Sequence, residues 1–140
     1  MKQFRFIGLG IFLAVVVFAV PLAASAQDPV VDEIQEIINL IKDYDKDDCI
    51  VGTGRGRSAD KRVKIFSHIL VAAKALIVIG DYENACDHLW STYLKSDGSY
   101  PPRNPADFIE EGDGEFCEGG EVDEINALID GVMMDLLCFE

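Results

Sequence analysis

The feature that most constrains this chain is a set of four cysteines placed behind an export signal. Two basic residues precede an apolar run from Phe6 to Val20, and Ala24-Ser25-Ala26 then offers a small-residue cleavage site. This order predicts a secretory signal peptide over residues 1–26, with the mature chain beginning at Gln27. Outside the cytoplasm thiols are oxidised, so the fold has to bring the cysteines together in pairs. They are Cys49, Cys86, Cys117 and Cys138.

Apolar residues recur at helical spacing in four stretches of the mature chain. The first stretch opens with Asp28, a residue that caps helices, and Pro29, which suits the first helical position. We expect this helix to reach about Tyr44. Ser58 is the expected cap of the second helix, and Gly80 is expected to end it.

Asp81 follows at once, so the second and third helices should form a tight antiparallel hairpin. The third helix should end near Ser96, and the fourth is expected over Val122–Leu137. Between them lies Tyr100–Gly120, a long acidic loop rich in proline and glycine. Because no convincing period-two run occurs, we predict an all-α domain over residues 27–140, a small four-helix bundle. The buried faces of the third and fourth helices should carry Tyr82, Ala85, Cys86, Leu89, Tyr93, Val122, Ile125, Leu128, Ile129, Val132 and Leu136.

Helix packing ranks the three pairings that four cysteines allow. If the third and fourth helices pack antiparallel, the end of the fourth lies beside the start of the third, which favours Cys86–Cys138. Cys49 and Cys117 then lie in loops at the opposite pole, which favours Cys49–Cys117. The pairing Cys49–Cys86 with Cys117–Cys138 would require Cys138 to reach the far end of its own helix, roughly 25 Å away. No CxxC pair occurs, so disulfides are favoured over a zinc site.

The charge balance limits the partners that the chain can have. Asp and Glu number 25 against 12 Lys and Arg, for a net charge of −13. A surface this acidic repels nucleic acid and anionic membranes, although the first effect of a high net charge is on solubility. No second apolar stretch is long enough to span a bilayer. We therefore expect a protein released into an extracellular or periplasmic compartment, without nucleic-acid binding or membrane insertion after cleavage; its oligomeric state is left open.

One short segment concentrates positive charge at the start of the second helix. A helix N-terminus with nearby guanidinium groups can bind an anion, such as a carboxylated or sulfated glycan or an acidic patch of a partner protein. The alternative is internal charge balance against the protein's own acidic loops. The candidate ligand-binding residues are Arg55, Arg57, Lys61, Arg62 and Lys64.

A second candidate is a calcium site at the end of the first helix. Asp43, Asp45 and Asp47 match the first, third and fifth positions of an EF-hand loop. The match then breaks, because Asp48 stands where the loop needs glycine and Gly54 where it needs glutamate. The alternative is a solvated acidic loop. Calcium is the single cofactor that the sequence suggests.

Catalytic motifs are missing from the sequence. It contains neither the GxSxG of serine hydrolases nor the HExxH of zinc proteases, and His88 beside Asp87 lacks a placed nucleophile. We therefore expect a protein that is not an enzyme.

The run Ile69–Leu76, followed by Gly80-Asp81-Tyr82 and Ala85–Leu89, resembles the FIMAH-like helical modules of secreted bacterial and archaeal proteins. The resemblance covers about half of the mature chain and consists mainly of a helix-hairpin pattern. It implies a small helical domain that binds polysaccharide or cell-surface glycan, and it carries no defined binding residues. The expected function is thus a secreted binding module for an extracellular polysaccharide or a partner protein. The alternative is a calcium-dependent structural component of an extracellular assembly.

Overall fold

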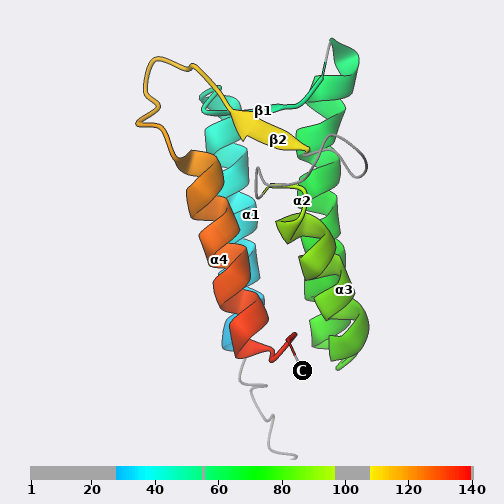
Figure 1. Cartoon of the computed structure of the whole chain (residues 1–140). Helices are drawn as coiled ribbons and strands as arrows, with labels where there is room; N and C mark the ends of the chain where they lie inside the picture. The colour runs from blue at the N-terminus through cyan, green and yellow to red at the C-terminus, as the bar shows by residue number, and fades with distance from the viewer. Residues whose placement is uncertain (1–27, 55, 97–107, 140) are drawn as a thin grey trace, which may run out of the picture.

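A computed structural model describes residues 28–54, 56–96 and 108–139 (Figure 1). The expected signal peptide, Arg55 and the long loop up to residue 107 lie outside the described residues. Of the described part, 67% is helical, in four helices accompanied by two short strands and two disulfides. No helix of these residues is long and apolar enough to cross a membrane.

Helix α1, Pro29–Lys46, begins as the sequence predicts. The Asp28 carboxylate accepts a hydrogen bond from the backbone N–H of Val30 at 3.1 Å, and Pro29 holds the first helical position. The isoleucines of this helix recur at three- and four-residue spacing and are buried.

Helix α2, Arg57–Val78, begins one residue before Ser58. The prediction of Ser58 as its cap is therefore wrong: Gly56 precedes the helix with φ of 60°, and no side chain caps it. At the other end, Gly80 has φ of 80°, a conformation that glycine adopts without strain. Asp81 then caps helix α3, Tyr82–Tyr93, by accepting from the backbone N–H of Asn84, as expected. Helix α3 lies beside α2 (Figure 1).

The expected helical fold is confirmed, and two short strands that the sequence did not predict accompany the helices. Strand β1, Ile50–Gly52, pairs antiparallel with strand β2, Ile109–Glu111. Strands of three residues are too short to show a period-two pattern, which explains why the sequence did not reveal them. Gly52 lies against the start of α2, where an added Cβ would stand 1.9 Å from the carbonyl oxygen of Ala59.

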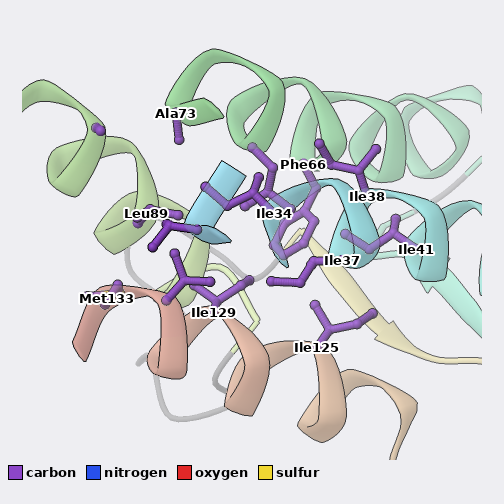
Figure 2. Close-up of a cluster of buried hydrophobic side chains, with 14 of the residues drawn as sticks. Ile34, Ile37, Ile38, Ile41, Phe66, Ala73, Leu89, Ile125, Ile129 and Met133 are labelled. Carbon is purple, nitrogen blue, oxygen red and sulfur yellow. The ribbon is translucent and has the colours of Figure 1, made fainter. Parts of the chain in front are cut away.

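Helix α4, Glu121–Asp135, completes the core (Figure 2). Isoleucines of α1 meet Phe66 of α2, Leu89 of α3 and Ile129 of α4 in one buried cluster. Two residues expected on the buried faces are instead exposed: Tyr82 at 47% and Leu128 at 42%. Met133 and Thr92, which were not expected there, are buried in their helices.

The two disulfides tie opposite ends of the helices. Cys86 at the start of α3 is bonded to Cys138 just after α4, and Cys49 beside β1 is bonded to Cys117 in the loop before α4. This is the pairing that the helix arrangement ranks first. The disulfides also indicate an oxidising environment.

Candidate functional site

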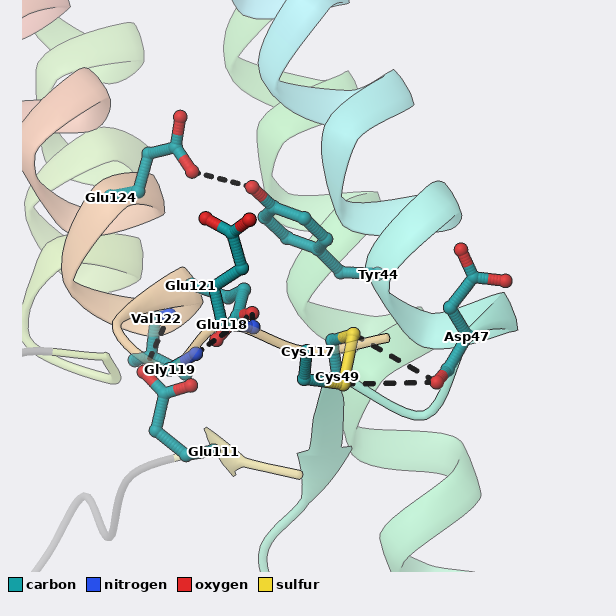
Figure 3. The surroundings of a disulfide bond; sticks show 10 residues. All are labelled: Tyr44, Asp47, Cys49, Glu111, Cys117, Glu118, Gly119, Glu121, Val122 and Glu124. Atoms are coloured by element: carbon teal, nitrogen blue, oxygen red, sulfur yellow. Dashed lines mark hydrogen bonds between the residues drawn. A yellow bond between two sulfur atoms is a disulfide. The ribbon is translucent and has the colours of Figure 1, made fainter. Parts of the chain in front are cut away.

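A cavity of about 270 Å³ opens beside the Cys49–Cys117 disulfide, and we call it the acidic cavity. It lies between the end of α1, the loop 116–120 and the start of α4 (Figure 3). None of the described residues that line it is a lysine, arginine or histidine. The acidic and aromatic side chains that line it are Asp47, Glu118, Glu121, Glu124, Tyr44 and Phe116.

Glu121 is the most unusual of these residues because its carboxylate is buried; the side chain is 6% exposed. Gly120, the residue before α4, offers no side-chain cap, and the Glu121 carboxylate folds back toward the loop that precedes the helix. Oε1 accepts from the backbone N–H groups of Glu118 at 2.8 Å and Gly119 at 3.2 Å. Oε2 is buried and has no hydrogen-bond partner.

Backbone hydrogen bonds, first of all from its own N–H, lower the pKa of Glu121, and they outweigh the opposing effect of burial. The Glu111 side chain contributes in the same direction. Glu111 extends from β2 and accepts from the backbone N–H of Val122 at 2.8 Å. Two carboxylates therefore gather at the positive end of the α4 dipole, and Glu121 is ionised at neutral pH.

Tyr44 lines the acidic cavity and links α1 to α4. Its hydroxyl donates to Oε2 of Glu124 at 2.5 Å. This hydrogen bond, together with burial and the surrounding glutamates, raises the pKa of Tyr44 to about 12. The bond orients the Glu124 carboxylate toward Tyr44 (Figure 3).

The acidic cavity is not a preformed metal cage. Within the described ranges, a single group of three possible ligands has its atoms within 4.8 Å of one another: Cys49, Cys117 and Glu121. The two sulfurs are bonded to each other, so they supply no thiolate for a metal. The carbonyl oxygen of Asp47 faces both sulfurs, at 3.8 and 3.9 Å.

The structure does not bring the three aspartates of the calcium hypothesis together. Asp43 and Asp45 belong to α1, where residues two positions apart point to different sides, and Asp47 caps the end of the helix. All three are exposed. An EF-hand needs a loop at this place, but α1 continues through it to Lys46.

The basic segment is only partly available to an anion. Arg57, Lys61 and Lys64 are exposed on α2, whereas Arg55 lies outside the described residues. Arg62 turns inward: it donates to the Thr53 hydroxyl, and its guanidinium lies 5.8 Å from the centre of the Phe108 ring.

Lys95 approaches the same Phe108 ring, at 5.2 Å, and burial lowers its pKa. Arg62 and Lys95 are therefore used for packing within the domain. The contacts of Arg62 are with a hydroxyl and an aromatic ring, and they differ from the charge balance against acidic loops that was the alternative interpretation.

Comparison with known proteins adds no relative. No family model matches the chain, and neither the curated proteins nor the solved structures contain a match.

The sequence alone did not single out Tyr44, Glu121 or Glu124. Glu118 belongs to the long loop that the sequence marks as acidic. A signal was present in the pair Gly119-Gly120, which leaves the start of α4 without a side-chain cap and is followed by acids at positions 121 and 124. The pairing of these acids with a tyrosine 80 residues away is a tertiary contact that no local pattern encodes.

Proposed function

We propose that the protein is a secreted, non-catalytic binding module, built as a disulfide-stapled four-helix bundle with an antiparallel α2–α3 hairpin. Its acidic cavity binds a basic segment of a partner protein. One observation carries this proposal: Oε2 of Glu121 is a buried carboxylate oxygen without a hydrogen-bond partner, in a cavity lined by further acids.

A buried carboxylate oxygen without a hydrogen-bond partner is costly, because no hydrogen bond or counter-charge offsets the desolvation of that oxygen. Among the described residues, the lining of the cavity supplies no cation. A lysine or arginine side chain from another protein supplies both charge and donors. The net charge of −13 would also attract such a basic partner over a distance.

Calcium is the second candidate ligand, and it requires a cage of acidic oxygen atoms. Calcium takes about six to eight oxygens at about 2.3–2.6 Å, which forces the ligands to lie close together. The cavity's carboxylates are not gathered in this way, so the geometry favours a larger cation.

A glycan is the third candidate and follows the FIMAH-like resemblance. It would use the exposed Arg57, Lys61 and Lys64 on α2 rather than the acidic cavity.

The three ligands can be compared by titration calorimetry on the oxidised protein, purified after export from an expression host. The probes are a peptide of alternating glycine and basic residues, calcium chloride, and a sulfated polysaccharide. We expect the basic peptide to bind and its affinity to fall as ionic strength rises from about 0.05 M to about 0.5 M, because exposed charges are screened.

The matched variants are Glu121→Gln and Glu110→Gln. Both remove one negative charge, but Glu110 lies in β2 and does not line the acidic cavity. Glu121→Gln should weaken peptide binding about tenfold or more, and Glu110→Gln should change it little. Equal effects of the two variants, or heat released with calcium or polysaccharide alone, would contradict the proposal.

A further inference from the structure

The acidic cavity combines separated carboxylates with aromatic rings, and this combination suits one kind of cation. Resting on the proposed function, we infer that the cavity is a guanidinium pocket, which accepts an arginine side chain of the partner in preference to lysine. At about 270 Å³, the cavity is smaller than the roughly 300–1,000 Å³ typical of sites for whole small molecules, and this size suits a single side chain.

The placement of the acids is the first argument. Glu118, Glu121 and Glu124 all line the cavity, yet their oxygens do not form a group within 4.8 Å. An ammonium can donate only to acceptors that lie within about 3 Å of its single nitrogen. A guanidinium presents five N–H donors in a rigid plane and can donate to two carboxylates simultaneously.

The available acceptor atoms are the second argument. Oε1 of Glu121 is occupied by two backbone N–H groups, whereas Oε2 is unpartnered. In Glu124, Oε2 accepts from the Tyr44 hydroxyl, which fixes the carboxylate in place. Charge-assisted hydrogen bonds to such pre-oriented carboxylates are among the strongest in proteins.

Phe116 provides the third argument. Its ring is 79% exposed, the largest exposure among the described large apolar side chains, and it lines the acidic cavity together with Tyr44. An aromatic face beside a cluster of acids allows a guanidinium to stack while it donates in its own plane. Packing within the domain does not explain this exposed phenylalanine.

Because Oε2 of Glu121 is buried, a cation can reach it only after a small shift of the residues around it. Glu118 is exposed, and Gly119 and Gly120 have φ of 81° and 99°, a region that glycine occupies without strain. A shift of this loop therefore costs little backbone strain, and it is the movement that we expect to give a cation access to Oε2 of Glu121.

The test compares an octapeptide of alternating glycine and arginine with its glycine–lysine counterpart, which has the same length and charge. Affinities are measured by calorimetry with the oxidised protein and two variants. Phe116→Leu removes the aromatic face, and Phe139→Leu is the matched control, an exposed phenylalanine outside the cavity. We expect the arginine peptide to bind about tenfold more tightly, because stacking and the planar fork are lost with lysine.

Phe116→Leu should reduce the preference for arginine to near unity, whereas Phe139→Leu should preserve it. Glu121→Gln should weaken the binding of both peptides. If this variant fails to fold, Phe116→Leu still tests the guanidinium pocket, because Phe116 lies on the surface. Equal affinities for the two peptides, or a preference that survives Phe116→Leu, would overturn the guanidinium pocket while leaving the proposed function standing. If neither peptide binds, both fail.

Discussion

At the scale of single residues, the acidic cavity is defined by carboxylates that have different partners. Glu121 is held by backbone N–H groups, Glu111 by the N–H of Val122, and Glu124 by the hydroxyl of Tyr44. These contacts orient the acids at the start of α4. The Tyr44–Glu124 pair has a measurable consequence, because it raises the pKa of the Tyr44 phenol.

The pKa of Tyr44 rises from 10.0 to about 12, chiefly because its hydroxyl donates to Glu124. Folding thus favours the protonated phenol, and the resulting stabilisation is fully present below pH 10 and lost as the pH rises from 10 to about 12. Denaturant unfolding of the parent protein and of Tyr44→Phe should show a stability difference that shrinks across this window.

Difference titration of tyrosinate absorbance should locate the same group. Glu124→Gln is expected to bring the Tyr44 transition back toward pH 10, since the charged acceptor is removed. A stability difference that stays constant between pH 10 and 12 would show that the hydrogen bond does not form in solution.

At the scale of elements, the helices were predictable from local signals and the strands were not. Asp28 and Asp81 cap helices as their types suggest, and the apolar period of α1 marks its buried face. The start of α2 was misplaced by two residues, because Ser58 is a good capping residue by type but lies within the helix. The ribbon of β1 and β2 depends on close backbone contacts between distant segments, which propensity does not report.

Substitutions of two glycines test this account of the elements, because they should change the stability of the protein in opposite directions. Gly112 follows β2, and an added Cβ would stand 1.9 Å from the carbonyl oxygen of Asp48. Gly112→Ala should therefore destabilise the protein by about 1–3 kcal/mol. Gly131 lies within α4 with nothing within 4 Å of an added Cβ, so Gly131→Ala should stabilise it by about 1 kcal/mol.

Thermal or denaturant unfolding of the two glycine variants provides the measurement. If both substitutions destabilise the protein similarly, then the close approach at Gly112 is not what distinguishes these positions.

At the scale of the whole molecule, the two ends have different characters. One end holds the Cys49–Cys117 disulfide and the acidic cavity, and the other holds the Cys86–Cys138 disulfide, beyond which the chain reaches its C-terminus (Figure 1). The disulfide pairing could be ranked from the sequence because it depends on the direction of whole helices. The acidic cavity could not be predicted from the sequence, because it depends on where individual side chains meet.

Removing each disulfide separates its contribution to stability from its contribution to binding. The bridges span 68 and 52 residues, so the chain-entropy model assigns each about 4 kcal/mol of stabilisation. Cys86→Ser with Cys138→Ser should lower the unfolding midpoint but preserve peptide binding wherever the protein remains folded. Cys49→Ser with Cys117→Ser should lower both, because it releases the loop that carries Phe116 and Glu118. Equal retention of binding by both double variants would contradict this account.

The central claim is that the acidic cavity is where this protein binds its partner. The most direct measurement is an amide chemical-shift map of the ¹⁵N-labelled, oxidised protein during titration with the glycine–arginine peptide. The account predicts that the largest shifts occur at Gly119, Gly120 and Glu121, with smaller ones near Tyr44. Shifts confined to the start of α2 or to the opposite end of the molecule would place the binding surface elsewhere and contradict it.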